Sequence, residues 1–394
     1  MAKTIVPIGP YHPLQEEPEF FTLTVDGEKI IDIDVRVGYN HRGIEKLSES
    51  KTFDQSTFVI ERICGICSTS HPFAYTRAVE DIIPMEVPER AKFIRTIIAE
   101  GERIHSHLLW LGLAGHFLGY NTVYMWAWKL REEILDAMEI LSGNRQNYAM
   151  FKPGGVRRDI KAEDIPVVLK KIDSIIPTAV MLKKAVIDDP VLHARTKGVG
   201  ILTKENAINY SALGPTARAS GVARDLRKNC PYGAYDRLEW DMIVTENGDV
   251  FDKVVVRVLE LFESIKIIKW CLNNLPKGEI DANIKDIPPG EGIGHIEAPR
   301  GETFHYVRSD GTNRPARHKV RAPTFMNLPT YKATILGQTL SDATIILAAI
   351  DPCYCCTERV AVRNIKGKKL LHGEDLVRMS QQKTELLRKK MGVK

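Results

Sequence analysis

Four of the seven cysteines in this chain form two Cys-x-x-Cys pairs. Cys64 and Cys67 make the first pair, and Cys353 and Cys356 make the second. Two intervening residues let both sulfurs face one ion from a single turn, so two such pairs predict a site with four thiolate ligands. The pairs lie near opposite ends of the chain, and the fold must therefore bring those ends together.

The residues that flank the two pairs bear on the kind of metal site they form. A closed structural zinc site with four thiolates is one interpretation. Arg62 and His71 stand beside the first pair, however, and Asp351 and Arg359 stand beside the second. A structural zinc site does not need ionisable groups around its sulfurs, so these neighbours favour a site that carries out a reaction.

The other three cysteines are not expected to bind metal. Cys230 and Cys271 stand alone and are predicted to be buried, and Cys355 lies inside the second motif but should point away from its neighbours. The string Gly-Glu-Gly-Ile-Gly at 290–294 lacks the third glycine and the preceding strand of a dinucleotide-binding fingerprint, so nucleotide binding is not predicted.

Long helices must carry most of the core that positions these residues. Apolar side chains recur at three- and four-residue spacing in four segments, which predicts amphipathic helices over 88–118, 121–141, 165–187 and 250–275. Pro88 suits the first turn of a helix, and the Pro-Gly-Gly that begins at Pro153 interrupts the helical pattern.

Short strands are predicted at both ends of the chain. Residues 4–8 and 30–37 are β-like runs, and 292–308 followed by a turn and 318–325 predicts a hairpin. A short helix over 331–340 and an apolar run over 343–350 then lead into the second cysteine pair. The expected fold is one mostly helical α+β domain, a long helix bundle with small peripheral sheets, over residues 1–359, followed by a basic tail over 360–394.

The net charge of +5 resides in this tail, where residues 360–394 carry 10 Lys and Arg against 3 Asp and Glu. The rest of the chain has a formal charge of −2, which argues against a nucleic-acid partner. The longest apolar run, 108–118, is 11 residues long, well short of the roughly 20 that cross a bilayer. No export signal is recognised at the start. We expect a cytoplasmic protein that associates with membranes only through partners.

The two cysteine motifs resemble those of a known enzyme family. RICGIC followed by His71, and DPCYCCTER, look like the signature motifs of nickel-iron hydrogenase large subunits. The strings TKGVGILT, GPTARASGVARDLRKNCPY and GPYHP resemble the hydrogenase-related 49 kDa subunit of respiratory complex I. That combination is typical of energy-converting hydrogenases. Because the complex I subunit lacks the four cysteines that this chain keeps, the resemblance favours a hydrogenase over a relative that reduces a quinone or a sulfur compound.

The resemblance implies a role for each cysteine of the two pairs. Cys64 and Cys353 would be terminal ligands of nickel, and Cys67 and Cys356 would bridge nickel to an iron that carries CN and CO. Heterolytic cleavage of H2 would leave its proton on the sulfur of Cys353. No iron-sulfur cluster is expected in this chain, and electrons would leave through the [4Fe-4S] cluster of a small-subunit partner.

The resemblance also implies roles for residues around the metals. Arg300 matches an arginine that lies over them, and Asp351 matches its partner. His71 matches a histidine that hydrogen-bonds a bridging thiolate. Glu17 resembles the glutamate that takes the proton from the terminal cysteine, with the adjacent Glu16 as its competitor.

Two features depart from the standard hydrogenase pattern or vary within it. Glu45 matches a glutamate that holds a magnesium ion, but Arg359 stands in place of the C-terminal histidine ligand and has no lone pair to donate. Many family members are cut at the position that here follows Arg359, whereas some energy-converting members keep the tail. If it is retained, the amphipathic stretch 374–391 would bind a partner or an anionic membrane face.

The expected partners follow from the same resemblance. They are the small subunit, further iron-sulfur subunits and integral-membrane subunits that pump ions, with ferredoxin as the electron carrier. The chain would then lie on the cytoplasmic face of the cell membrane.

Overall fold

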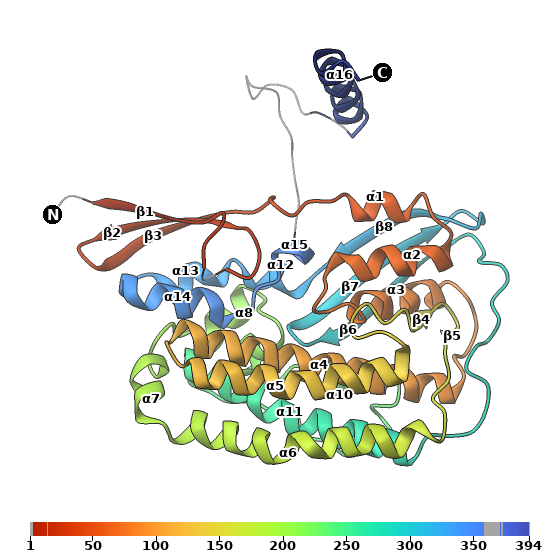
Figure 1. Cartoon of the computed structure of the whole chain (residues 1–394), viewed down its shortest axis with the longest axis horizontal. Coiled ribbons are helices and arrows are strands. Elements are labelled where there is room, and N and C mark those ends of the chain that lie inside the picture. The colour runs from red at the N-terminus through yellow and green to blue at the C-terminus, as the bar shows by residue number, and fades with distance from the viewer. Residues whose placement is uncertain (1–2, 14, 358–370, 372, 394) are drawn as a thin grey trace.

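A bundle of long helices forms the centre of the molecule. The computed structural model describes residues 3–13, 15–357, 371 and 373–393. The long helices are α4 (Glu89–Phe117), α5 (Asn121–Ser142), α6 (Asp164–Asp188) and α11 (Val250–Asn273). Helix α4 packs against α5 and α11, and α6 packs against the same two helices (Figure 1). Helix α4 is buried along nearly its whole length, so it is the central helix of the bundle.

Local sequence signals explain where these helices begin and end. Helix α4 follows Pro88, and α5 ends at Gly143, which adopts a left-handed conformation with φ of 83°. Helix α11 begins after Asp249, whose side chain accepts a hydrogen bond from the backbone N–H of Asp252. The four predicted long helices are confirmed, with every end within two residues of its predicted position.

The remaining helices are shorter than these four. A 3-10 turn (Glu61–Ile63) precedes the first cysteine pair. The other helices before the β6–β8 sheet are α1 (Ile44–Ser48), α2 (Phe53–Ile60), α3 (Ser70–Asp81), α7 (Pro190–Thr196), α8 (Lys204–Asn209), α9 (Gly214–Arg218) and α10 (Leu226–Asn229). Those after it are α12 (Pro323–Asn327), α13 (Thr330–Ile335), α14 (Leu340–Ala349), α15 (Tyr354–Thr357) and α16 (Gly373–Met391).

The N-terminal sheet is antiparallel, in the order β1 (Thr4–Ile8), β2 (Phe20–Asp26) and β3 (Lys29–Arg36). Its central strand β2 was not among the predicted strands. Strand β3 contacts α13, and the backbone N–H of Ile30 donates to the carbonyl of Gln338. The β1–β2 loop, described over residues 9–13 and 15–19, lies beside the second cysteine segment, where Glu17 contacts Cys353 and Cys355.

A second antiparallel sheet contains β6 (Gly290–Ala298), β7 (Gly301–Ser309) and β8 (Pro315–Arg321). The hairpin predicted over 292–308 and 318–325 is wrong in one respect, because the chain turns an extra time at Pro299 and Arg300. The segment 323–327 is also helical (α12) instead of extended. A two-stranded ribbon, β4 (Phe151–Lys152) and β5 (Gly155–Val156), lies elsewhere in the chain.

Alternate glycines let β6 lie directly against α3. A Cβ atom added at Gly292 would lie 2.0 Å from the carbonyl oxygen of Ala78, and one at Gly294 would lie 1.9 Å from that of Ala74. The glycine string at 290–294 therefore serves close strand-to-helix packing. It also holds the β6–β7 turn near the start of α3, where the first cysteine pair lies.

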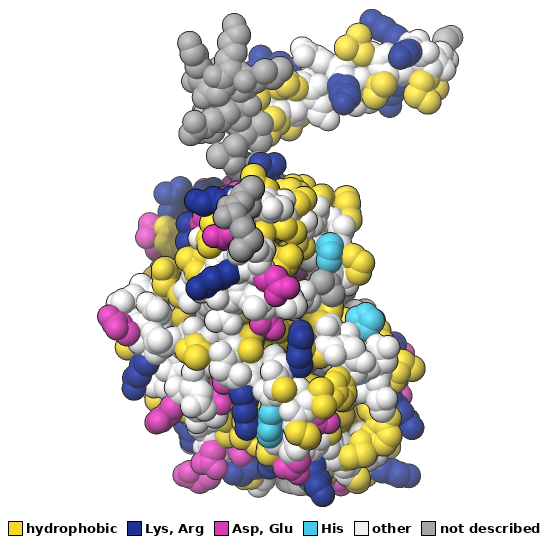
Figure 2. Space-filling view, turned by 90° about the vertical axis from the view of Figure 1, so that its left-hand side faces the viewer, with side chains coloured by type: hydrophobic (Ala, Val, Ile, Leu, Met, Phe, Trp, Pro, Cys, Tyr) yellow, Lys and Arg dark blue, Asp and Glu magenta, His cyan; other side chains and the backbone are white. Residues whose placement is uncertain are grey.

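The C-terminal helix α16 has an exposed surface with apolar and basic side chains. Helix α16 exposes apolar side chains such as Leu386 and Met391, and Figure 2 shows hydrophobic and basic side chains interspersed on it. Within the described residues, none of the helices combines the length and apolarity needed to cross a bilayer. The predicted cleavage point after Arg359 lies outside the described residues.

Candidate metal centre

The four predicted cysteines meet at one buried point between the two ends of the domain. Their Sγ atoms all lie within 4.8 Å of one another. Cys64 and Cys67 follow the 3-10 turn and precede α3, whereas Cys353 precedes α15 and Cys356 lies in it. In the described part of the chain, this is the one group of three or more side chains placed to share a metal ion.

The spacing of these sulfurs suits a shared metal. Cys64 Sγ lies 3.3 Å from Cys353 Sγ, and Cys67 Sγ lies 3.6 Å from Cys356 Sγ. A tetrahedral ion bonded at about 2.3 Å would separate its sulfurs by roughly 3.8 Å. Cys353 and Cys356 are closer, at 2.8 Å. None of the four forms a disulfide, so four soft donors are available to a thiophilic metal.

The four thiols do not share one proton affinity. Hydrogen bonds from neighbouring cysteines, Cys353 first among them, hold the pKa of Cys64 well below its usual range. Burial raises the pKa of Cys356 well above its usual value. In the metal-free centre Cys64 therefore gives up its proton more readily than Cys356 does.

Arg300 stands at the turn between β6 and β7 and is buried. Its Nη2 lies 2.6 Å from Asp351 Oδ1, its Nε donates to the Asp351 carbonyl at 2.9 Å, and its Nη1 donates to Ser106 Oγ at 3.1 Å. Burial opposes its charge, but the Asp351 carboxylate and the nearby cysteine sulfurs raise the pKa of Arg300 well above its usual value. The guanidinium is thus held as a fixed positive charge near the sulfurs.

Of the two ionisable residues that flank the first pair, His71 faces the sulfurs and Arg62 does not. Nε2 of His71 lies 3.3 Å from Cys356 Sγ, and burial lowers the pKa of His71 to about 4. Arg62 does not face the sulfurs, because its partly exposed side chain pairs with Glu61 at 2.7 Å. The expectation that Arg62 surrounds the sulfurs was wrong.

Glu17 lies in the β1–β2 loop and reaches the second cysteine pair. Its Oε1 is 3.8 Å from Cys353 Sγ, and its Oε2 accepts the backbone N–H of Cys355 at 2.7 Å. Burial raises the pKa of Glu17. Desolvation by surrounding protein atoms, with the charge of Asp351 next, raises the pKa of Glu16 to about 8, although Glu16 is exposed at the surface.

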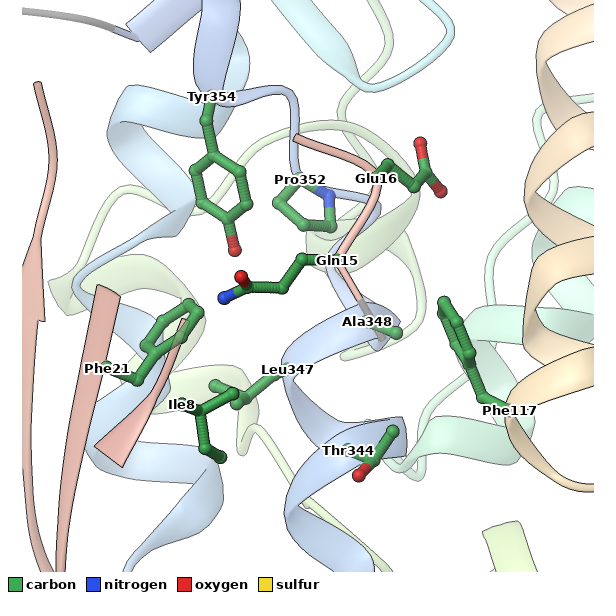
Figure 3. Close-up of a pocket in the computed structure, with 10 residues that line it drawn as sticks. All are labelled: Ile8, Gln15, Glu16, Phe21, Phe117, Thr344, Leu347, Ala348, Pro352 and Tyr354. Carbon is green, nitrogen blue, oxygen red and sulfur yellow. The ribbon is translucent and has the colours of Figure 1, made fainter. Parts of the chain in front are cut away.

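A small cavity of about 30 Å³ adjoins this loop. Figure 3 shows the Gln15 amide directed into it, near Tyr354 and Phe21, whereas the Glu16 carboxylate points away. Glu16 and Glu17 also line an open cleft formed by residues 10–13 and 15–18. Glu17 therefore contacts Cys353 on one side and lines this cleft on the other.

Both carboxylate oxygens of Glu45 interact with other residues of the protein. Its Oε2 lies 3.1 Å from Lys319 Nζ, and its Oε1 accepts the backbone N–H of Val320 at 3.0 Å. Arg359 lies outside the described residues. A magnesium site at Glu45 stays a prediction.

Arg42 is a site residue that the sequence did not single out. Its guanidinium donates to the carbonyls of Arg62 and Ile63, both at 2.6 Å, and lies 3.5 Å from the Cys355 carbonyl. It joins the two cysteine segments through their backbones. Its place three residues before Glu45, in the string Arg-Gly-Ile-Glu, was the available signal.

The three other cysteines stand outside the cluster. Cys355 is partly buried, and its sulfur is not part of the four-sulfur group. Cys271 is buried, as predicted, but Cys230 is exposed, so that prediction was wrong for Cys230.

Comparison with known proteins shows the family to which this chain belongs. Residues 118–287 and 282–359 match the family "Respiratory-chain NADH dehydrogenase, 49 Kd subunit", and residues 42–113 match "Nickel-dependent hydrogenase". The chain is 42% identical to membrane-bound hydrogenase subunit alpha of Pyrococcus furiosus, with 96% of this chain and 93% of the relative covered. It belongs to the family of energy-converting, complex I-related nickel-iron hydrogenase large subunits.

Two further relatives of this hydrogenase-family chain extend the comparison. It is 38% identical to carbon monoxide-induced hydrogenase of Rhodospirillum rubrum, covering 91% of this chain and 100% of the relative. A solved structure of a membrane-bound sulfane sulfur reductase, described as an archaeal respiratory membrane complex, superposes with a TM-score of 0.86 at 31% identity, covering 91% of this chain and 98% of that one. The predicted fold, a mostly helical α+β hydrogenase large-subunit domain, is confirmed.

Proposed function

We propose that this chain is the H2-activating subunit of an energy-converting nickel-iron hydrogenase, catalysing reversible H2 oxidation and proton reduction. The observation that carries the proposal is the buried group of four cysteine sulfurs beside the Arg300–Asp351 ion pair. A structural zinc site would need the sulfurs alone. A fixed guanidinium and a nearby carboxyl group suit a centre that handles protons and charge.

The residues present fit a nickel-iron group. Cys64 and Cys353 would hold nickel alone, and Cys67 and Cys356 would bridge it to an iron that carries CN and CO. When bound, this group supplies the redox change and the Lewis acidity that H2 cleavage requires. Thiolates suit it because soft sulfur ligands bind such metals well.

The chain's own residues would orient the reaction and move its proton. Asp351 and Ser106 fix the planar Arg300 guanidinium, which polarises H2 without having to reorganise. Glu17, at 3.8 Å from Cys353 Sγ, would accept the proton from that sulfur. Burial raises the pKa of Glu17 toward neutral pH, which suits a group that relays protons.

Partners would carry the electrons and the ions. A small subunit with a [4Fe-4S] cluster would receive the electrons, and further iron-sulfur and integral-membrane subunits would couple them to ion pumping, with ferredoxin as the carrier. Relatives named as a membrane-bound hydrogenase subunit and as part of a respiratory membrane complex support this proposal. The chain would lie on the cytoplasmic face of the membrane, with the basic tail after residue 359 either removed or bound to a partner.

Metal analysis and infrared spectroscopy of the purified complex test the proposal. Nickel and iron should be present together, with CO and CN stretching bands, and the complex should interconvert H2 and protons. The Cys67→Ser complex should lose these bands. Zinc at the four sulfurs, without CO or CN bands, would contradict the proposal.

A second candidate function is the reduction of a quinone or a sulfur compound. The likeness to the sulfane sulfur reductase structure and the match to the 49 kDa subunit favour it. Reduction of polysulfide or quinone by a complex that lacks the infrared bands would establish this alternative.

A further inference from the structure

Three buried histidines connect the cysteine cluster to helix α1. Nδ1 of His71 lies 3.1 Å from Nε2 of His305, and Nδ1 of His305 lies 2.9 Å from Nε2 of His318. Nδ1 of His318 lies 2.7 Å from Ser48 Oγ. With the contact between His71 Nε2 and Cys356 Sγ at 3.3 Å, these bonds form one continuous chain from the sulfur to Ser48.

Every ring nitrogen in this chain has a partner, and none of those partners is a carboxylate side chain. His71 contacts Cys356 and His305, His305 contacts the other two rings, and His318 contacts His305 and Ser48. All three rings are fully buried. Burial disfavours a charged ring that lacks an anionic partner, and it lowers the pKa of His318 to about 4. Each ring therefore carries one proton, on one of its two nitrogens.

The serine end of the chain sets the direction of these hydrogen bonds. Ser48 Oγ lies 2.8 Å from the carbonyl oxygen of Glu45. A carbonyl can only accept, so the Ser48 hydroxyl donates to it. A hydroxyl has one proton, and Ser48 Oγ must therefore accept the hydrogen bond from His318 Nδ1–H.

This direction propagates from ring to ring. With its proton on Nδ1, His318 offers a lone pair at Nε2, and His305 Nδ1–H donates to it. His305 then accepts at Nε2 from His71 Nδ1–H. The Nε2 atom of His71 is left with a lone pair facing the Cys356 sulfur, which is satisfied when Cys356 is a thiol that donates its S–H.

A metal-bound Cys356 has the opposite requirement. Its sulfur is a thiolate that carries no proton, so it can only accept a hydrogen bond, and a lone pair on His71 Nε2 would repel it. We propose that Ser48, acting through His318 and His305, sets which nitrogen of His71 carries the proton. Metal binding at Cys356 reverses the direction of every hydrogen bond between Cys356 and Ser48.

The reversal conserves the protons of the three rings and of Ser48, and only Cys356 loses one. The thiol proton of Cys356 is released to water when the metal binds. Each of the three ring protons ends on Nε2 in place of Nδ1, and the Ser48 hydroxyl turns from the Glu45 carbonyl to His318 Nδ1. No ring changes its charge. The Glu45 carbonyl keeps the backbone N–H of Glu49, at 3.4 Å.

Ser48, His305 and His318 are therefore positioning residues, because they act on the sulfur only through His71. The inference goes beyond the proposed function, since it requires only a metal-bound thiolate at Cys356. Zinc, which binds four thiolates and has no redox chemistry, can serve as the probe. Absent infrared bands would refute the hydrogenase proposal and leave this test intact.

Nitrogen NMR on the full chain with isotope-labelled histidine tests the reversal directly, because it distinguishes protonated from bare ring nitrogens. The His71 proton should lie on Nδ1 in the metal-free chain and on Nε2 after one equivalent of Zn²⁺. The same nitrogen protonated in both states would overturn the inference. A doubly protonated ring in the zinc-loaded chain would overturn it as well.

Ser48→Ala tests the role of the serine. In the metal-free direction Ser48 makes two hydrogen bonds, to the Glu45 carbonyl and from His318, and in the reversed direction it makes one. The substitution removes this difference of one bond, so the ratio of Nε2–H to Nδ1–H on His71 should rise about fivefold in the metal-free chain. Ser56→Ala is the matched control, because Ser56 is buried and bonds backbone carbonyls on the same helix pair.

A double variant tests whether the effect travels through the rings. In a His305→Phe background the series of hydrogen bonds between Ser48 and His71 is interrupted. Ser48→Ala should then no longer shift the His71 proton. A persisting shift would overturn the inference, as would equal spectra for Ser48→Ala and Ser56→Ala. If His305→Phe does not fold, the comparison of the two serine variants decides the question.

Discussion

The Arg300 Nη2 and Asp351 Oδ1 atoms lie 2.6 Å apart in the protein interior, although the two residues are 51 positions apart in sequence. Arg300 occupies the β6–β7 turn, and Asp351 lies two residues before Cys353 with a positive φ of 55°. This ion pair joins the second sheet to the segment that carries Cys353. It fixes a charge beside the sulfurs and also links two parts of the scaffold.

Serine at any one of Cys64, Cys67, Cys353 or Cys356 should abolish H2 turnover, because each change removes one of four soft ligands. Nickel content should fall in parallel, as measured by elemental analysis of the purified complex. Cys355→Ser is the matched control, since its sulfur lies outside the four-sulfur group, and it should keep metal and activity. Full nickel and full turnover in any of the four variants would refute the ligand assignment.

Arg300→Lys should keep the metals and slow H2 activation by about 10²–10³-fold. A compact ammonium cannot reproduce the planar guanidinium that bonds Asp351 and Ser106 together. The measurement is the turnover rate at matched nickel content. Arg224→Lys is the control, because Arg224 forms an ion pair with Glu302 at 3.0 Å with its own side chain exposed. Unchanged turnover in Arg300→Lys would remove Arg300 from the reaction.

Glu17→Gln should separate proton movement from chemistry at the metals. Glutamine keeps the shape and the bond from the Cys355 N–H but cannot take a proton. Isotope exchange between D2 and water should collapse, while para-to-ortho conversion of H2, which needs no solvent proton, should survive with nickel unchanged.

Glu16→Gln is the companion variant for this experiment. Its carboxylate points away from the cavity in Figure 3, and it should leave isotope exchange largely intact. Loss of both reactions in Glu17→Gln would indicate a structural role for Glu17. Retention of both would transfer the relay to Glu16 or another carboxylate.

Gly294→Ala should lower the free energy of unfolding by about 1–3 kcal/mol, the usual range for overpacking. The added methyl would lie 1.9 Å from the Ala74 carbonyl and would push β6 away from α3. Chemical denaturation of the metal-free chain measures the effect. At Gly290 the methyl would meet only the flexible Ile82 side chain, at 2.9 Å, so Gly290→Ala should cost less. Equal stability of the two variants would contradict this account of the glycine string.

Local sequence patterns were sufficient for much of the scaffold. The spacing of apolar residues predicted α4, α5, α6 and α11, because a helix that packs on one face must repeat its apolar side chains every three or four residues. Strand β2 and the turn at Arg300 escaped prediction. Both belong to local hairpins, in which Asp26 pairs with Lys29 and Ala298 pairs with Gly301. Strand preference depends on side-chain packing against neighbouring strands, so it is a weaker signal in the sequence than helical periodicity.

The cysteine pairs and their motifs determined, from sequence alone, the number of sulfurs and the family. Only the tertiary structure decided which neighbours face them. Arg62 adjoins the first pair but turns toward Glu61, whereas His305 and His318, far away in sequence, line up behind His71. Spacing along the chain determines which side chains can reach one ion from a single turn. The directions of the other side chains around the sulfurs, and of the Ser48 hydroxyl, depend on how α1, α3 and the β6–β8 sheet pack together.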